Sequence, residues 1–469
     1  MGTPKAVPAA LAVYAEKLHS EGKEFKVGLI TGGATGSQVD SALVQAHAVA
    51  FRTPFQSNKE MRNAINAGEV QYYDVHLSQI GQDVRYGFLG DIDVAIVEAS
   101  DITEEGDIVL STSVGISPTL IQVAHKVIIE LNEAHASKLT GMHDIYIPDA
   151  PPYRREIPIY RVNDRAGSIS VRVNPEKVVG VVRTNERDRI AAFTPLNDTT
   201  SRIGQNVADF LLGEYQRGAI PREFLPLQSG VGNIANAVLG ALGADKKLPA
   251  FSMYTEVIQN SVIDLMMQER IRFVAGSSLT LSDDRLDMLY DNIDVMKERV
   301  LLRPQEITNH PEMIRRLGII AVNTALEADI FGNVNSTHVL GSKMMNGIGG
   351  SADFARNAYL SIFTTPSTAK DGLISSIVPH VSHVDSTEHD VRILVTEQGV
   401  ADLRGKSPSQ RARCIIENCA HPDYKELLWD YLKLSEGKGC HTPMSLRNAL
   451  KMHIAFAETG DMRNTKFEM

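Results

Sequence analysis

The sequence predicts an α/β protein with two large domains built on mainly parallel sheets. The chain has 469 residues, more than one ordinary core accommodates. Short apolar runs alternate with amphipathic helical stripes, and both halves of the chain show this alternation. Because strands buried on both faces read as near-continuous apolar runs, the pattern favours parallel sheets.

The first half begins with a strand and a glycine-rich turn. Residues 26–31 (KVGLIT) form an apolar run, which Gly32-Gly33-Ala34-Thr35-Gly36 follows. Further strands are predicted at residues 92–98, 108–111, 126–131 and 178–182. Residues 183–189 (RTNERDR) are densely charged, a shift in composition that is typical of a linker. We therefore expect domains at 1–182 and 190–469.

The second half repeats the class of the first. Apolar residues from 203 to 215 recur at helical spacing, and Gly230-Val231-Gly232-Asn233 opens another predicted helix. Strands are predicted at 271–275, within 319–331, and at 360–363, 374–378 and 393–395, followed by helices at 407–419 and 423–434.

Composition excludes several classes of protein. A formal net charge of −10 argues against broad nucleic-acid binding, which needs a concentrated basic surface. The three cysteines have no zinc-ligand spacing and favour reduced thiols. No apolar run reaches the roughly 18 residues of a membrane-spanning helix, so we expect a cytoplasmic protein without membrane partners.

Glu256 is the first candidate for chemistry. It stands in the β-prone run Met253-Tyr254-Thr255-Glu256-Val257-Ile258-Gln259, which the pattern connects directly to an amphipathic helix. A carboxylate at a strand-to-helix junction can act as a nucleophile. The competing interpretation is a solvated acid in the first helical turn, where the helix dipole favours negative charge.

Glycine-rich loops supply the second candidate feature. Residues 341–354 (GSKMMNGIGGSADF) combine four glycines with Asn346, Ser351 and Asp353. Such a loop lets backbone N–H groups approach an anion or oxyanion, although it matches neither the Walker nor the full dinucleotide pattern. An ordinary tight connection would explain the same residues. Gly230-Val231-Gly232 is a second turn of this kind.

A histidine-rich segment offers a competing chemistry. His380, His383, Asp385 and His389 have the side-chain types of a metal site, but His-x-x-His-x-Asp is not a standard zinc signature. A solvated connection is the competing interpretation. Glu397, in Thr396-Glu397-Gln398-Gly399, follows a predicted buried strand and could face a cleft. The serine-hydrolase pattern GxSxG is absent.

Five motifs in order carry a family resemblance. They are residues 227–233 (LQSGVGN), 255–259 (TEVIQ), 332–336 (GNVNS), 346–351 (NGIGGS) and 396–399 (TEQG). Together they resemble the acetyl-CoA hydrolase/transferase family, closest to its succinyl-CoA:acetate CoA-transferase members, over nearly the whole chain. The resemblance implies two CoA-transferase-like α/β domains with the active site in the cleft between them.

The resemblance also implies roles for individual residues. Glu256 would be the nucleophile that becomes a glutamyl-CoA thioester, Glu397 a supporting acid, and Arg189 the group that holds the substrate carboxylate. The oxyanions would be held by the amides of Val231 and Gly350 and the side chain of Asn309. The residues implied to contact CoA are Leu227, Gln228, Ser229, Gly230, Val231, Leu326, Asn346, Gly350 and Lys370.

Two departures from the family pattern are visible. Relatives carry a strand and a glycine-rich loop before the segment that begins here at Pro4, so we expect this chain to lack them. Ala34 stands where close relatives have a serine near the small carboxylate, which leaves the acyl specificity open.

The resemblance implies a homodimer that uses acyl-CoA as substrate and needs no permanently bound cofactor or metal. Four functions stay open from the sequence. They are a ping-pong CoA-transferase, an acetyl-CoA hydrolase, a metal-dependent hydrolase built on His380, His383 and Asp385, and a non-catalytic CoA-binding module.

Overall fold

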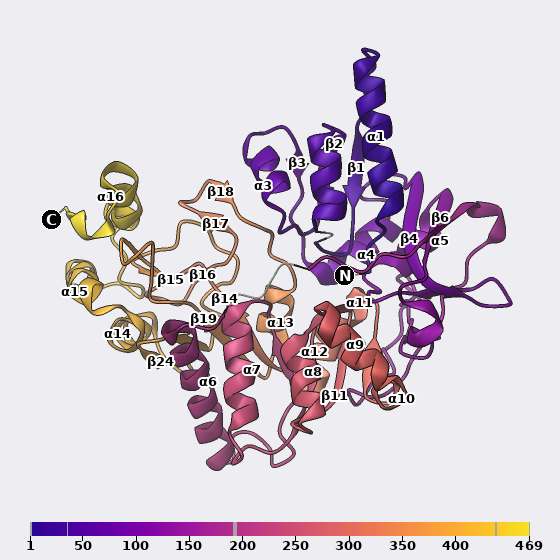
Figure 1. Cartoon of the computed structure of the whole chain (residues 1–469). Coiled ribbons are helices and arrows are strands. Elements are labelled where there is room, and N and C mark those ends of the chain that lie inside the picture. Colours follow the sequence, from indigo (N-terminus) through magenta and orange to yellow (C-terminus); the bar gives the residue numbers. More distant parts are fainter. Residues whose placement is uncertain (1, 35, 191–194, 437–438, 469) are drawn as a thin grey trace. The chain divides into compact units, whose positions relative to one another are not determined.

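The computed structural model describes residues 2–34, 36–190, 195–436 and 439–468 (Figure 1). The chain forms two compact units. Unit 1 comprises Met1–Ala192, Ala250–Leu317 and Asn346–Asp353, and unit 2 comprises Phe193–Pro249, Gly318–Met345 and Phe354–Met469. The predicted domains, 1–182 and 190–469, are continuous segments, whereas these units are not. The difference lies in residues 250–317 and 346–353, which group with the N-terminal segment.

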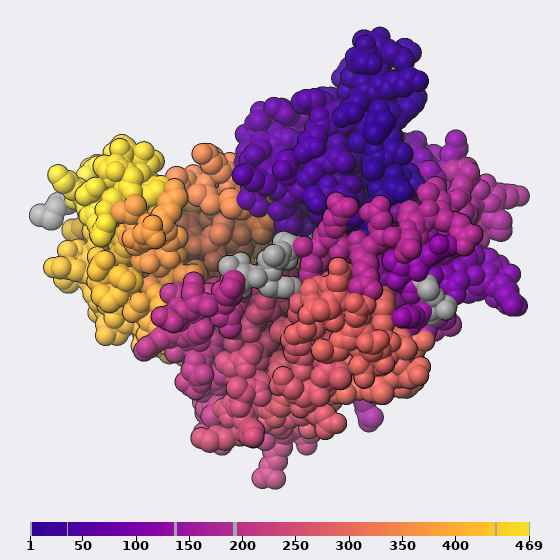
Figure 2. Space-filling model, viewed as in Figure 1, coloured from indigo at the N-terminus to yellow at the C-terminus, as the bar shows by residue number. Residues whose placement is uncertain are grey.

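A small parallel sheet in unit 1 carries the predicted glycine-rich turn. Its order is β1 (Val27–Ile30), β2 (Val49–Thr53), β3 (Gln71–Tyr72), and β1 confirms the predicted first strand. Helices α1 (Ala6–Ser20) and α3 (Lys59–Asn66) contribute to its core through Ala15 and Met61. The other face of α1 is exposed at Val13 and Tyr14, and this helix projects from the surface at the indigo end of the chain (Figure 2).

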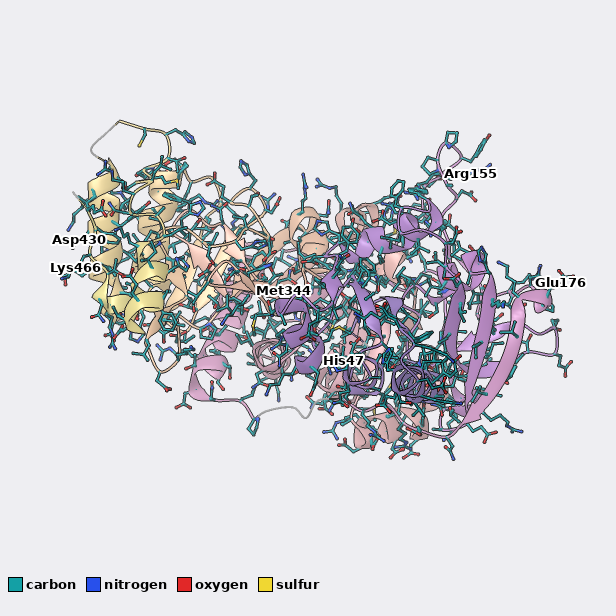
Figure 3. All side chains as sticks on the ribbon, turned by 90° about the horizontal axis from the view of Figure 1, so that it is seen from above. His47, Arg155, Glu176, Met344, Asp430 and Lys466 are labelled. Atoms are coloured by element: carbon teal, nitrogen blue, oxygen red, sulfur yellow. The ribbon has the colours of Figure 1, made fainter. Side chains whose placement is uncertain are left out.

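A second sheet in unit 1 has the order β5 (Ile108–Leu110), β4 (Val94–Ile102), β6 (Lys126–Asn132), β7 (Val178–Thr184). These strands confirm the four other runs predicted in the first half. β4, β6 and β7 are parallel, while β5 returns antiparallel to β4. Arg155 lies on a projecting loop between β6 and β7, and Glu176 lies in the short turn that leads into β7 (Figure 3).

The remaining strands of unit 1 hold the segment around Glu256. β9 (Phe251–Tyr254), β11 (Ile271–Gly276) and β13 (Val300–Leu302) are parallel neighbours. β10 (Val257–Gln259) pairs in parallel with β12 (Ser278–Thr280). The other helices of unit 1 are η1 (Ser37–Ser41), α2 (Ala42–Gln45), α4 (Leu77–Arg85), α5 (Ser117–Val123), η2 (Ala136–Leu139), η3 (Pro175–Lys177), α8 (Asn260–Met267), α9 (Asp283–Asp291), α10 (Ile293–Lys297), α11 (Gln305–Thr308) and α12 (Pro311–Leu317).

Unit 2 contains a mainly parallel sheet. Its order is β8 (Leu227–Ser229), β14 (Ile320–Thr324), β19 (Leu360–Thr364), β23 (Ile393–Thr396), and β24 (Gly399–Asp402) pairs antiparallel to β23. The predicted helices appear as α6 (Asp198–Gln216), α7 (Asn233–Ala244), α14 (Pro408–Cys419) and α15 (Pro422–Glu436). Short elements complete the chain: β15 (Glu327–Asp329), β16 (Val334–Asn335), β17 (His338–Val339), β18 (Lys343–Met344), α13 (Ser351–Asn357), β20 (Thr368–Ala369), β21 (Ile374–Ser375), β22 (Ile377–Val378), α16 (Lys451–Thr459) and η4 (Met462–Asn464).

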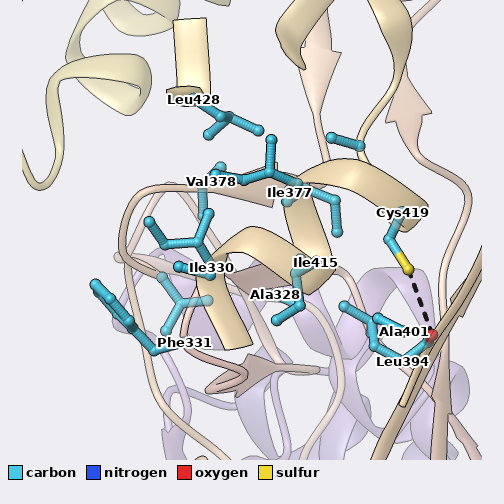
Figure 4. Packing of buried hydrophobic residues seen from close by; sticks show 14 of the residues in the cluster. Ala328, Ile330, Phe331, Ile377, Val378, Leu394, Ala401, Ile415, Cys419 and Leu428 are labelled. Carbon is cyan, nitrogen blue, oxygen red and sulfur yellow. Dashed lines mark hydrogen bonds between the residues drawn. The ribbon is translucent and has the colours of Figure 1, made fainter. Parts of the chain in front are cut away.

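The core of unit 2 packs helices α14 and α15 against its strands. Ile415 and Leu428 are fully buried among residues such as Ile377 and Leu394 (Figure 4). The buried thiol of Cys419 donates to the carbonyl of Leu394 at 3.3 Å. This contact uses the thiol in packing and agrees with the expectation of reduced cysteines.

Candidate active site

Glu256 lies between two short strands. β9 ends at Tyr254, β10 begins at Val257, and α8 begins only at Asn260. The β-prone run at residues 253–259 leads directly into a helix, as predicted, since β10 ends at Gln259 and α8 begins at Asn260. Glu256 itself does not lie at that junction, because residues 257–259 continue as a strand that pairs with β12. The first-turn interpretation is wrong, since Glu256 precedes the helix by four residues. Its carbonyl accepts hydrogen bonds from the N–H groups of Ser277 and Ser278 at 2.7 and 3.2 Å.

Asn309 and Gly350 meet at the Glu256 carboxylate. A Cβ atom placed on Gly350 would lie 2.7 Å from Glu256 Oε2 and 2.2 Å from Asn309 Nδ2. No side chain fits there without displacing one of these groups, so glycine lets the backbone approach both. The structure thus brings together three of the residues that the family resemblance implies for catalysis.

The Asn309 amide offers a hydrogen-bond donor in this position. Asn309 is fully buried directly after α11, and its Oδ1 accepts a hydrogen bond from Thr308 Oγ1 at 2.9 Å. That bond orients the amide group. Among the described residues, Asn309 Nδ2 has no hydrogen-bond partner of ordinary geometry. A preoriented donor of this kind is what an oxyanion requires.

The surroundings make Glu256 a weak acid. Burial raises the pKa of Glu256 from its ordinary value of 4.5 to about 7, the Asn309 side chain partly opposes the rise, and the negative charge of Asp353 adds to it. A carboxylate with a higher pKa is a better nucleophile, and at pH 7 or above a large fraction is still ionised. This electrostatic setting suits covalent chemistry better than a solvated surface role does.

The glycine-rich segment of residues 346–353, termed the glycine loop here, comprises the loop at 346–350 and the first turn of α13, and it is anchored within unit 1. The N–H of Ile348 donates to both oxygens of Asp74 at 2.9 and 3.1 Å. The carbonyl of Gly349 accepts from the N–H of Leu77 at 3.3 Å. A Cβ atom on Gly347 would lie 2.2 Å from Tyr72 Oη and 3.0 Å from Asp74 Oδ1, so the loop packs tightly on the end of β3 and the segment that follows it. These contacts fix the backbone of Gly350.

Asp353 was named from the sequence as part of the glycine-rich segment, but no role in the site was predicted for it. It is 5% exposed, and Ser78 donates its N–H to Oδ2 at 3.0 Å and its hydroxyl to Oδ1 at 2.6 Å. His76 Nδ1 lies 3.9 Å from Oδ1. Burial raises the pKa of Asp353 to about 6, although the bonds from Ser78 oppose the rise. Its position three residues after Gly350 was the available signal, whereas nothing in the sequence points to His76 or Ser78.

The turn implied to contact CoA lies in unit 2. Leu227, Gln228 and Ser229 form β8, and the N–H of Gly230 donates to the carbonyl of Val322 at 3.1 Å. Val231 is 58% exposed, so its backbone is at the surface of the unit. Gly232 has a φ of 100°, which favours glycine, and α7 begins at the next residue as predicted.

Three further predicted residues lie in unit 2. Glu397 follows β23, as expected, and accepts hydrogen bonds from the N–H of Ser367, at 2.8 Å, and from the Ser367 hydroxyl. It therefore fixes the segment that leads to Lys370. The ammonium of Lys370 lies 5.0 Å from the centre of the Phe456 ring, and Leu326 is 38% exposed.

Arg189 and Asn346 lie in unit 1. The Arg189 side chain is 73% exposed, its Nη2 lies 3.9 Å from Glu186 Oε2, and its N–H donates to Gln38 Oε1 at 3.4 Å. Asn346 begins the glycine loop, and its Oδ1 is buried without a hydrogen-bond partner among the described residues. The roles of both residues remain predictions.

The histidine-rich segment is occupied by hydrogen bonds within unit 2. Asp385 accepts from the N–H of Ser336 at 2.6 Å and from the Thr337 hydroxyl, and His383 Nε2 lies 3.3 Å from Asp385 Oδ1. His380 Nδ1 lies 2.9 Å from the carbonyl of Val381. In the part of the chain that the structure describes, no group of three His, Cys, Asp or Glu side chains is arranged to hold a metal ion.

Comparison with known proteins places the chain in a family. The sequence profile of the acetyl-CoA hydrolase/transferase N-terminal domain matches residues 1–183, and that of the C-terminal domain matches residues 286–432. The propanoyl-CoA:succinate CoA transferase of Escherichia coli is 49% identical over 461 residues, which cover 98% of this chain and 93% of that protein.

Other relatives carry different names. The succinyl-CoA:acetate CoA-transferase of Clostridium kluyveri is 49% identical over 463 residues, covering 98% of this chain and 85% of its own. The acetyl-CoA hydrolase of Schizosaccharomyces pombe is 46% identical over 480 residues, covering 99% of this chain and 91% of its own.

Two solved structures share the fold. RipA from Yersinia pestis has a TM-score of 0.70 and 22% identity, covering 92% of this chain and 91% of RipA. The 4-hydroxybutyrate CoA-transferase of Porphyromonas gingivalis has a TM-score of 0.61 and 22% identity, covering 90% of this chain and 96% of that structure.

The fold and the matches together define a CoA-transferase-like α/β enzyme. More narrowly, the chain belongs to the acetyl-CoA hydrolase/transferase family, whose chemistry uses CoA thioesters as substrates. The predicted family is thereby confirmed. Among the described helices, none combines the length and apolar character needed to cross a bilayer.

Proposed function

We propose that this enzyme is a CoA-transferase that moves CoA between an acyl-CoA and a small carboxylate through a glutamyl-CoA thioester on Glu256. Succinyl-CoA or acetyl-CoA is the proposed donor. The convergence of Gly350 and Asn309 on the Glu256 carboxylate is the observation that carries the proposal. The names of the two relatives at 49% identity support the choice of a transferase.

The proposed reaction has two half-reactions. The Glu256 carboxylate attacks the thioester carbonyl, which forms a C–O bond, breaks the C–S bond and gives a mixed anhydride with CoA thiolate. The thiolate then attacks the Glu256 carbonyl, which forms the enzyme thioester and releases the first carboxylate. A second carboxylate reverses these steps, so the kinetics are ping-pong. The Asn309 amide and the N–H of Gly350 stabilise the oxyanions, aided in the proposal by the N–H of Val231.

The remaining family positions bind the substrates in this proposal. The residues that contact CoA in this proposal are Leu227, Gln228, Ser229, Gly230, Leu326 and Asn346. The ammonium group of Lys370 offers a positive charge to the anionic CoA. Arg189 holds the substrate carboxylate. Glu397 supports the segment of Lys370 through its bonds to Ser367.

Trapping the covalent intermediate tests the proposal. The enzyme is incubated with succinyl-CoA or acetyl-CoA alone, treated with borohydride or hydroxylamine, and digested for mass spectrometry. Modification is expected on the peptide that contains Glu256 and is expected to be absent in Glu256→Gln. An unmodified peptide from enzyme that turns over in parallel would overturn the proposed intermediate.

An acetyl-CoA hydrolase is the second candidate, and the relative of that name at 46% identity favours it. The two functions differ in their acceptor. A transferase releases CoA from acetyl-CoA at a much lower rate when no carboxylate acceptor is present, whereas a hydrolase does not. Screening several acyl-CoAs with labelled acetate would identify the acceptor dependence and the preferred donor together.

A metal-dependent hydrolase and a non-catalytic binding module also have direct tests. A metal-dependent hydrolase built on His380, His383 and Asp385 would lose activity on chelation and retain it in Glu256→Ala. A non-catalytic CoA-binding module would bind acyl-CoA without exchange. The proposed homodimer and cytoplasmic location are tested by light scattering of the purified chain and by fractionation of the source cells.

A further inference from the structure

A second buried carboxylate shares the environment of Glu256. Asp353 is 5% exposed and Glu256 is partly exposed, and the negative charge of Asp353 is one of the causes that raise the pKa of Glu256. The Asn309 side chain stabilises the charged forms of both. Asn309 therefore connects the proposed nucleophile to a carboxylate that has no assigned role.

Asp353 is also connected to the site through hydrogen bonds that hold the glycine loop. Its two oxygens accept the N–H and the hydroxyl of Ser78, at the start of α4. These bonds tie down the C-terminal end of the glycine loop, while Asp74 and Leu77 hold its middle through Ile348 and Gly349. Gly350 lies between these attachment points. Its backbone is therefore held against the start of α4, in the position where it approaches Glu256.

We propose that Asp353 is a positioning residue that fixes the Gly350 amide beside Glu256 and, as a nearby negative charge, favours the uncharged glutamyl thioester over the free Glu256 carboxylate. This inference rests on the proposed function. In the exchange, Glu256 loses its charge when the thioester forms, and the released carboxylate carries that charge away. Repulsion from Asp353 favours this departure and makes the Glu256 carboxylate more nucleophilic.

Other charged groups near the pair have identified partners. His76 lies beside Asp353. Arg85 on α4 forms a bidentate pair with Glu306 on α11, and Asp74 accepts the N–H of Ile348. These groups make two controls informative. Asp74→Asn weakens the same loop without removing Asp353, and His76→Gln removes the imidazole while the carboxylate stays.

The test compares Asp353→Asn with these controls. The rate of thioester formation from acyl-CoA is measured from pH 5 to 9, and the equilibrium fraction of CoA-thioester is measured at pH 8 by mass spectrometry of the intact full-length chain. In Asp353→Asn we expect the pH midpoint to fall by roughly 0.5 to 1 unit. We expect the equilibrium constant for thioester formation to fall about 3- to 10-fold, since one pKa unit corresponds to tenfold.

The controls separate charge from loop structure. Asp74→Asn is expected to slow the reaction while its midpoint stays within about 0.3 units of the wild type, because no charge beside Glu256 is lost. An unchanged midpoint in Asp353→Asn, or equal shifts in Asp353→Asn and Asp74→Asn, would overturn the inference. A shift of the same size in His76→Gln would assign the effect to the imidazole and also overturn it.

A second variant and the wild-type adduct make the outcome of this test interpretable. If Asp353→Asn does not fold, as judged by circular dichroism, Asp353→Ser removes the same charge and carries the same comparison. Wild-type enzyme that forms no adduct on Glu256 refutes the proposed function itself. Wild-type enzyme that forms the adduct, with an unshifted midpoint in the Asp353 variant, refutes only the role of Asp353.

Discussion

Gly350 approaches Glu256 so closely that a methyl group in place of one glycine hydrogen would lie 2.7 Å from the Glu256 carboxylate. The same methyl group would lie 2.2 Å from the Asn309 amide. Both contacts are shorter than nonbonded atoms tolerate. Residue 350 must therefore be a glycine if the side chains of Glu256 and Asn309 are to keep their positions.

Gly350→Ala is expected to lower kcat by about 10²-fold or more, because the added methyl displaces Asn309, Glu256 or the loop that carries the amide. Steady-state kinetics with acyl-CoA and a carboxylate acceptor measure this effect. Gly240→Ala is the matched control, since Gly240 lies on α7 with open space around its Cβ position. The control should keep its activity and gain about 0.5 to 1 kcal/mol of stability. Equal losses in both variants would contradict the steric explanation.

Asn309→Ala removes the buried donor that faces the site. We expect kcat to fall by about 10²- to 10³-fold, as for the loss of one oxyanion donor. The pH midpoint of thioester formation should also rise, because the Asn309 side chain normally lowers the pKa of Glu256. A pH–rate profile therefore distinguishes this variant from Asp353→Asn, in which the midpoint moves the other way. A falling midpoint in Asn309→Ala would refute the electrostatic role of the amide.

Glu256→Gln should stabilise the protein at alkaline pH. The folded-state pKa of about 7 exceeds the ordinary value of 4.5, so the folded state binds more protons than the unfolded state between these values. The free energy of unfolding therefore falls as pH rises through this window. Replacing the acid by an amide removes a cost of about 1 to 3 kcal/mol above pH 7 and little below pH 4.5.

Urea unfolding at pH 4.5 and at pH 8 measures the difference between Glu256→Gln and the wild type. The control is Glu133→Gln, which changes a half-exposed glutamate that pairs with Arg183 at the surface. It should leave the pH dependence of stability unchanged. Equal stability gains for Glu256→Gln at both pH values would show that the effect has another origin than proton binding.

Arg303 provides a test of stability away from the proposed chemistry. Its side chain is fully buried after β13 and donates to Asp144 Oδ2 at 2.8 Å, and Asp144 is 1% exposed. Arg303→Met leaves Asp144 buried without its counter-charge and should cost about 3 to 5 kcal/mol in the free energy of unfolding. The exposed pair Lys433–Asp430 is the contrast, and Lys433→Met should cost less than about 1 kcal/mol. Similar costs for the two substitutions would contradict the importance of burial.

The regular elements were predictable because their patterns are local. The run at residues 26–31 confirms β1, and the glycines at 230 and 232 correctly predict the start of α7. The order of the elements along the chain also indicates mainly parallel sheets. Local patterns do not determine which distant segments group together, and so the return of residues 346–353 to unit 1 was not visible in the sequence.

Residues of the candidate site were predictable only where they belong to a motif that resembles the family. Glu256 was selected through the family resemblance, while the local pattern alone correctly predicted a β-prone run followed by a helix but left a first-turn acid as the competing interpretation of Glu256. Ser78 reaches Asp353 across 275 positions, a pairing that no periodicity reveals. The exposed side chain of Arg189 and the surface position of Val231 are likewise properties of tertiary structure.

The interleaved order of unit 1 has a consequence for biosynthesis. A ribosome releases Glu256 and Asn309 well before residues 346–353, the last segment of that unit, are made. A chain that terminates earlier contains the carboxylate but neither Gly350 nor Asp353. Truncated products from interrupted translation therefore lack part of the candidate site as well as part of the core, and splitting the gene at one position cannot yield both units intact.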